Sequence, residues 1–183
     1  MLHLYLIRHA EAVPNGDPNY ADDERPLTDA GREQARRLGT TLAAHGVRFD
    51  FVISSPLTRA RQTAEELLQG LGTNPPPLEF ADELACGAKP RKVDRLVLKY
   101  DGESIALVGH QPDLGEYAGR LIGSKKASVD FEKAGIACIA CEDPPGKGCG
   151  ALLWLLTPAW YGATPPEPPA MYAGHTGHAG HAT

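Results

Sequence analysis

The sequence has no long hydrophobic run and no excess of positive charge. No stretch approaches the roughly 20 apolar residues that a membrane-spanning helix needs. The short apolar start lacks the basic region of a signal peptide and ends in Arg8-His9. The net charge of −5 at pH 7 gives no indication of the basic surface that nucleic-acid-binding proteins carry. We therefore expect a cytoplasmic protein that binds neither membranes nor nucleic acids.

Cysteine is also scarce, with four in the chain. Cys138 and Cys141 have the C-x-x-C spacing of zinc and redox sites. However, they lie in an apolar run, residues 135–140, that is typical of a strand, and residues three apart on a strand point to opposite faces. The sequence contains no second close pair to complete a zinc site. We favour small apolar residues in a strand, and we expect no metal or cofactor.

The length of 183 residues suits one domain with its own core, which we expect over residues 1–163. Residues 164–183 are rich in proline, glycine and histidine, a low-complexity composition that predicts a disordered tail. His175, His178 and His181 recur every three residues and could bind nickel, copper or zinc weakly. A flexible tail without a metal is the interpretation we prefer.

Strand and helix patterns alternate along the chain. A helix is predicted from Asp29 to His45, with Thr28 as its N-cap and Gly46 at its end. This alternation predicts an α/β fold: a three-layer sandwich with a central, mostly parallel sheet and helices on both faces. The other predicted helices start at Ser55-Pro56, Pro90 and Pro112, and the predicted strands cover residues 1–7, 50–54, 78–80, 104–108, 135–141 and 151–157.

Three of these strands end in residues suited to phosphoryl chemistry. The first ends in Arg8-His9, the second leads through Ser54-Ser55 to Arg59, and the third ends in Gly109-His110. Ligands of open α/β sheets bind beyond the carboxyl ends of the strands, so parallel neighbours would bring these side chains into one pocket. Guanidinium groups suit phosphoryl oxygens, and a neutral imidazole is nucleophilic near pH 7.

Each of these residues also has an ordinary explanation. Arg8 could be a surface residue at a strand end, and His9 or His110 alone could be structural. Arg59 and Arg61 could both be solvated, and because they are two apart on a helix, only one of them should face a site. The joint occurrence of two arginines and two histidines favours the functional interpretation.

Four sequence blocks resemble the histidine phosphatase superfamily, the phosphoglycerate-mutase-like proteins. Arg8-His9-Ala10 is similar to its RHG or RHA signature, and residues 26–35 are similar to its PLTxxGxxQA segment. Residues 54–63 and 108–112 match its SxxxRAxQT and VxHxP segments. The blocks occur in order and cover the chain to about residue 123. The short chain looks most like the SixA-type phosphohistidine phosphatases, which lack the large insertions of the mutases.

The resemblance implies a metal-independent mechanism. His9 would be the nucleophile and would become phosphorylated transiently. Arg8 and Arg59 would hold the phosphoryl oxygens, with His110, as an imidazolium, as a further donor. The family pattern selects Arg59, which leaves Arg61 on the surface.

Three further residues are candidates for the site. Many family members take a proton donor from the loop that corresponds to the one after the predicted strand at residues 78–80. Glu83 is the best match there, although it could be an ordinary loop residue. Asn15 lies where mutases place a phosphate-contacting asparagine. Ser55 could bind an anion at the start of the following helix.

The resemblance leaves three functions open. The first is removal of phosphate from phosphohistidine in a protein, whose imidazole leaves easily once protonated. The second is hydrolysis of a small-molecule phosphate ester on the same fold. The third is a catalytically silent phosphate-binding regulatory module, against which the intact quartet of Arg8, His9, Arg59 and His110 argues. The expected partner is thus a phosphorylated protein or a small phosphate ester.

Overall fold

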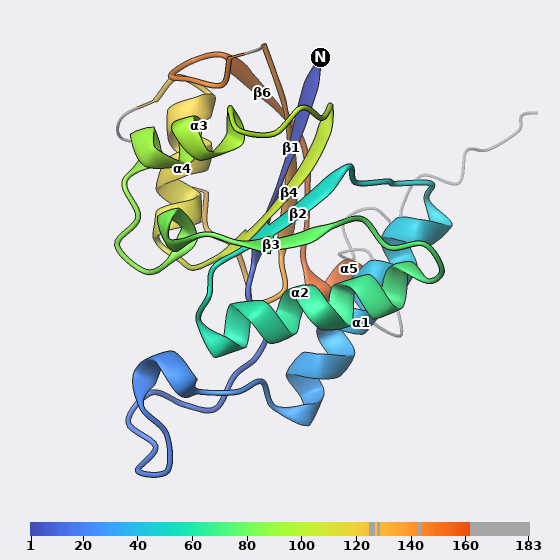
Figure 1. The fold of residues 1–183 in the computed structure, drawn as a ribbon, viewed down its shortest axis with the longest axis vertical. Helices are drawn as coiled ribbons and strands as arrows, with labels where there is room; N and C mark the ends of the chain where they lie inside the picture. Colours follow the sequence, from blue (N-terminus) through green and yellow to red (C-terminus); the bar gives the residue numbers. More distant parts are fainter. Residues whose placement is uncertain (125–126, 128, 143, 162–183) are drawn as a thin grey trace, which may run out of the picture.

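The computed structural model describes residues 1–161 except 125–126, 128 and 143. Its six strands form one sheet in the order β3-β2-β4-β1-β5-β6 (Figure 1). The first four in this order run parallel, and β5 runs antiparallel to both of its neighbours. The strands are β1 (Leu2–Arg8), β2 (Phe51–Ser54), β3 (Leu78–Phe80), β4 (Ser104–Gly109), β5 (Ile136–Cys141) and β6 (Gly150–Leu156).

Helices cover both faces of this sheet, so the predicted three-layer α/β sandwich is confirmed (Figure 1). One face carries α1 (Asp29–Ala44), α2 (Thr58–Leu71) and the short α5 (Pro158–Tyr161), and the other carries α3 (Pro90–Val97) and α4 (Asp113–Leu121). Two 3-10 turns, η1 (Asp22–Glu24) and η2 (Asp82–Leu84), lie in the connections. Across the described ranges, none of the helices has the length and apolar character to cross a bilayer.

The strands of the sheet centre are buried on both sides, which explains their continuous apolar runs. Leu4 and Leu6 of β1 join the core cluster beneath α3 and α4, whereas Ile7 joins the cluster beneath α1 and α2. The same alternation separates the two cysteines of β5. Cys138 lies opposite Tyr5, which packs beneath α1 and α2, and Cys141 belongs to the cluster beneath α3 and α4.

The two cysteines of the C-x-x-C pair therefore lie on opposite faces of the strand, as predicted. Within the part of the chain that the structure describes, no group of three or more His, Cys, Asp or Glu side chains is placed to hold a metal. The histidines of the tail lie outside the described residues.

The predicted start of α1 agrees with the structure, and the predicted start of α2 does not. The Thr28 hydroxyl accepts a hydrogen bond from the Gly31 amide at 3.0 Å, as expected for an N-cap. The predicted start of α2 at Ser55-Pro56 is wrong by three residues, because the helix begins at Thr58. Ser55 instead continues the sheet ladder, since its amide donates to the Val108 carbonyl at 2.9 Å.

Helices α1 and α2 approach closely at two glycines. A Cβ atom on Gly39 would lie 2.2 Å from the Leu67 carbonyl oxygen, and one on Gly70 would lie 2.1 Å from that of Arg36. We expect Gly39→Ala to lower the free energy of unfolding by about 1–3 kcal/mol, although alanine is the better helix former. Urea denaturation measures this. Thr40→Ala, exposed on the same helix, should change stability by less than about 0.5 kcal/mol, and equal stabilities would contradict the close approach.

Candidate active site

The register of the sheet brings three strand ends to one edge. Arg8 of β1 pairs with Gly109 of β4, and Val108 pairs with Ser54 of β2. The next residue of each strand is therefore His9, His110 or Ser55. The His9 amide donates to the Gly109 carbonyl at 2.9 Å, which fixes the first of these positions by a backbone hydrogen bond.

His9 is held in one tautomer. Its Nδ1 lies 2.8 Å from the Ala10 carbonyl oxygen. Because a carbonyl can only accept, Nδ1 carries the hydrogen and the lone pair is on Nε2. Burial, followed by the positive charges of Arg59, Arg8 and Arg25, lowers the pKa of His9 to about 4. The ring is therefore neutral at pH 7, and its Nε2 has no hydrogen-bond partner among the described residues.

His110 lies beside His9, with the two ring centroids 5.2 Å apart. Its Nε2 is 2.8 Å from the hydroxyl of the fully buried Ser55. Its Nδ1 is buried and has no hydrogen-bond partner among the described residues. Burial lowers the pKa of His110 to about 3, with contributions from His9 and Arg59. These neighbours favour the neutral ring at pH 7, whereas the resemblance implies an imidazolium that donates to a phosphoryl group.

Arg59 enters the same pocket from the first turn of α2 and is 3% exposed. Its Nη1 donates to the Asp22 carbonyl at 2.7 Å, and its Nη2 lies 3.4 Å from Cys86 Sγ. Its Nε has no partner among the described residues. Arg61, two positions on, is exposed and pairs with Glu65 at 3.7 Å. The helix thus turns one arginine inward and the other to the surface, as predicted.

Arg8 approaches from the end of β1. Its Nη1 donates to the Phe131 carbonyl at 2.5 Å, and its Nε has no partner among the described residues. Thr63 of α2 then links the elements, because its hydroxyl donates to the Arg59 carbonyl at 2.7 Å and accepts from the Ala10 amide at 3.0 Å. Two arginines, two histidines and a serine therefore form one largely buried cluster beyond the strand ends, and its cations and hydrogen-bond donors suit a tetrahedral anion.

Comparisons with known proteins agree with this geometry. Residues 4–89 match the family model of the histidine phosphatase superfamily (branch 1). An uncharacterized protein of Picosynechococcus sp. is 37% identical over 139 residues, which are 74% of this chain and 82% of that protein. The chain belongs to the histidine phosphatase superfamily.

Solved structures share the fold of this superfamily member. The protein histidine phosphatase SixA in complex with tungstate aligns with a TM-score of 0.76 and 24% identity, over 86% of this chain and 98% of that one. An alpha-ribazole phosphatase from Shigella flexneri aligns with a TM-score of 0.63 and 24% identity, over 80% and 94% of the two chains. Membership of this superfamily identifies the chain as a phosphatase.

Sequence reasoning missed two charged residues at the rim of the phosphatase site. Asp22 Oδ2 lies 3.6 Å from Arg59 Nη2, and Asp22 Oδ1 lies 2.9 Å from Arg25. A hydrogen bond from Arg25, with the charge of Arg59 adding to it, lowers the pKa of Asp22, so it is a carboxylate at neutral pH. The available signal was the charged run of residues 22–25 directly before the Pro26-Leu27-Thr28 block.

Of the three further candidates, the structure brings only Ser55 into contact with the quartet. Glu83 pairs with Lys99 at 3.1 Å and makes no hydrogen bond or ion pair with Arg8, His9, Arg59 or His110. Hydrogen bonds from its own backbone and from Lys99 lower the pKa of Glu83, the wrong direction for a proton donor. Asn15 is exposed in its loop, and its side chain makes no hydrogen bond within the described ranges.

The two buried histidines make stability depend on pH. The folded-state pKa values of His9 and His110, about 4 and about 3, lie below the usual 6.5, so between these limits the unfolded chain binds more protons. Their contribution is thus present above pH 6.5 and is lost as the pH falls toward 4. We expect the free energy of unfolding, measured in urea, to be about 1–3 kcal/mol lower at pH 5 than at pH 7, because the two rings take up protons only when the chain unfolds. The difference should shrink in His110→Asn, and an unchanged difference would contradict this assignment.

Proposed function

We propose that this phosphatase is metal-independent and works through a phosphohistidine intermediate on His9, with phosphohistidine in a protein as its substrate. One observation carries the proposal. The Nδ1–H of His9 is bound by the Ala10 carbonyl, so Nε2 keeps its lone pair, and His110 and Arg59 lie beside the ring. A neutral nucleophile flanked by cations can attack a phosphoryl group without repelling its negative charge.

In the first step, Nε2 of His9 attacks phosphorus and the bond to the substrate's leaving nitrogen breaks. The ring becomes more positive as the new N–P bond forms, and the Ala10 carbonyl stabilises the Nδ1–H that it holds. Arg8 and Arg59 bind the equatorial oxygens, on which negative charge is spread in the transition state. The charge that a metal ion supplies in kinases would thus come from guanidinium groups.

In the second step, water attacks the phosphoryl group on His9. The N–P bond breaks, His9 regains its Nε2 lone pair, and the product leaves as dihydrogen phosphate, which carries both protons of the water. His110 acts as a donor to the phosphoryl oxygens through Nδ1, which has no partner among the described residues. A phosphoryl dianion beside the ring would raise the pKa of His110 and favour the proton-donating form.

The state of the two nearby carboxylates favours phosphohistidine over an ester. Glu83 pairs with Lys99, and Asp22 is held ionised by Arg25, so neither is a good proton donor to an alkoxide. A protonated imidazole needs no such donor, because it leaves as a neutral group. The likeness to a protein histidine phosphatase is consistent with this substrate class.

A small phosphate ester is the second candidate, supported by the structural likeness to an alpha-ribazole phosphatase. A silent regulatory module is disfavoured, because binding alone would not require a histidine with a free, neutral Nε2.

A substrate screen in the presence of EDTA tests the proposal. We expect phosphohistidine peptide to be hydrolysed with a kcat/KM at least about tenfold above that for sugar and nucleotide phosphates, without added metal. A preference for one small ester would replace the first candidate by the second. A requirement for a divalent metal would contradict the mechanism.

A further inference from the structure

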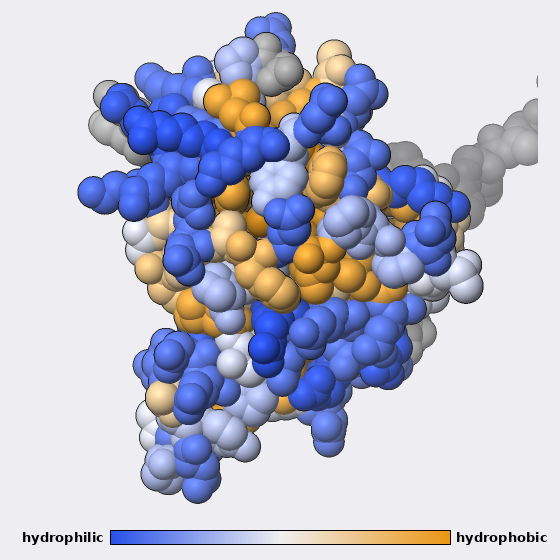
Figure 2. Space-filling model, in the orientation of Figure 1, coloured by the Kyte–Doolittle hydropathy of each residue, from blue (hydrophilic) through white to orange (hydrophobic). Residues whose placement is uncertain are grey.

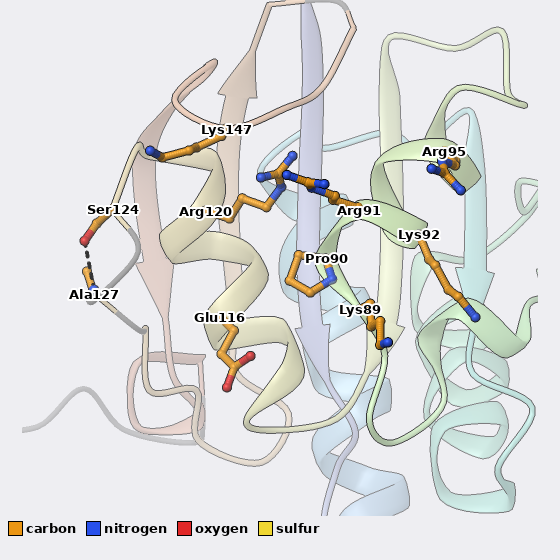
Figure 3. A pocket seen from close by; sticks show the side chains of 10 residues that line it. All are labelled: Lys89, Pro90, Arg91, Lys92, Arg95, Glu116, Arg120, Ser124, Ala127 and Lys147. Carbon is orange, nitrogen blue, oxygen red and sulfur yellow. Dashed lines mark hydrogen bonds between the residues drawn. The ribbon is translucent and has the colours of Figure 1, made fainter.

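A groove lined mainly by cations lies between α3 and α4, outside the phosphate pocket (Figure 3). Its volume is about 870 Å³. Six of the 18 lysines and arginines of this acidic chain line it. Figure 2 shows strongly hydrophilic side chains gathered over this part of the molecule. The six cations are Lys89, Arg91, Lys92, Arg95, Arg120 and Lys147.

The positive charge of the groove is largely uncompensated. Among the described residues, Arg120 is the only one of the six with an ion pair, formed with Asp94 at 2.6 Å. This pair joins α4 to α3 and so fixes the two walls. Glu116 is the only acidic residue that lines the groove within the described ranges. Like charges held together without partners repel one another, which is tolerated where an anionic ligand offsets the repulsion.

One end of the groove lies close to the phosphate site in the fold. In the connection before α3, Cys86 Sγ lies 3.4 Å from Arg59, and the Gly87 amide donates to Asp113 Oδ2 at 2.8 Å. Lys89 of the same connection lines the groove. Pro90 lines both the groove and a small cavity that reaches His110. A substrate in the pocket and a chain in the groove would therefore meet at these residues.

We propose that this groove is the docking surface for an acidic segment of the phosphoprotein substrate. The inference rests on the proposed function, since it concerns the protein whose phosphohistidine enters the pocket. Complementary charge speeds encounter and suppresses wrong partners, which suits an enzyme that must choose among phosphoproteins. The walls also include Pro90 and Ala127, against which the apolar parts of a peptide can pack.

Two double variants distinguish the effect of the groove cations from the effect of the protein's total charge. Arg91→Gln with Arg95→Gln removes two exposed groove cations that have no ion pair among the described residues. Arg37→Gln with Arg61→Gln removes two exposed cations of α1 and α2, on the opposite face of the sheet. Glutamine keeps helix propensity close to that of arginine, so folding should be similar in both. Circular dichroism and urea denaturation verify this.

The kinetic probes are two phosphohistidine peptides of equal length, one flanked by Asp and Glu and the other by Ser and Gln. We expect the unmodified protein to prefer the acidic peptide by about tenfold in kcat/KM at low salt. The Arg91/Arg95 variant should lose most of this preference, whereas the Arg37/Arg61 variant keeps it. Turnover of p-nitrophenyl phosphate should stay within about twofold in both variants, because the phosphate pocket is unchanged.

Binding of the unphosphorylated acidic peptide, followed by fluorescence anisotropy, separates this proposal from the catalytic one. We expect weaker binding only in the Arg91/Arg95 variant, and weaker binding at high salt. Equal binding by both variants would overturn the docking surface even if phosphohistidine is hydrolysed. Tighter binding of a single-stranded oligonucleotide than of the acidic peptide would overturn it as well. If the peptide still binds but phosphohistidine is not hydrolysed, the result would instead contradict the proposed function.

Discussion

Replacing His9 with alanine should reduce kcat by at least about 10³-fold, because the proposed nucleophile is lost while the arginines remain. Steady-state hydrolysis of phosphohistidine peptide and of p-nitrophenyl phosphate measures the effect. The variant should still fold, since His9 contributes one side-chain hydrogen bond, to the adjacent Ala10 carbonyl.

His45→Ala is the matched control. His45 is exposed at the end of α1, and its substitution should leave kcat within about twofold. Turnover that survives in folded His9→Ala would show that another group, or water, attacks phosphorus directly.

Replacing Arg59 with alanine should reduce kcat/KM by about 10²–10³-fold. This guanidinium is 3% exposed and is fixed by Asp22 and Cys86, so it is already oriented when a phosphoryl group arrives. Arg59→Lys should recover only part of the loss, because an ammonium cannot make the two parallel hydrogen bonds of a guanidinium. The comparison requires kcat/KM for one small ester and one phosphohistidine peptide.

Arg61→Ala tests whether position, rather than charge, matters on this helix. It removes the same charge two residues later, from an exposed site paired with Glu65, and should cost less than about twofold. Similar losses in Arg59→Ala and Arg61→Ala would contradict the placement of Arg59 in the pocket. Urea denaturation of Arg59→Ala shows whether a loss of folding contributes.

Much of the fold and the quartet could be predicted because strong local patterns surround them. β1 and β4 are apolar runs that end directly in Arg8-His9 and Gly109-His110, so the strand pattern also located the residues beyond it. Once the strands were taken as parallel neighbours, sheet geometry brought those ends together. The turn of helix α2 then decided which arginine faces inward.

The rim of the pocket could not be predicted, because it depends on how loops fold back. Asp22 meets Arg59 across 37 positions of sequence, and no periodic pattern reports such a contact. Glu83 lies in the expected loop, but Lys99, which belongs to a different part of the chain, binds its carboxylate. The start of α2 was misplaced because a Ser-Pro pair suits a helix start equally well three residues from the true one.

The protonation state of His110 could not be predicted from the sequence either. A histidine next to a presumed anion site suggests an imidazolium, but burial and the neighbouring cations lower its pKa to about 3. The lowering comes first from burial and then from His9 and Arg59, which only the folded arrangement brings beside His110.

Trapping the phosphoryl group on the enzyme tests the proposed role of His9 most directly. A rapid-quench reaction with ³²P-labelled substrate, followed by peptide mapping under alkaline conditions, locates the label. The proposed mechanism predicts an acid-labile, alkali-stable phosphoryl group on the peptide that contains His9, formed at a rate at least equal to kcat and absent from His9→Ala. Turnover with no label on the protein, or label on another residue, would contradict it.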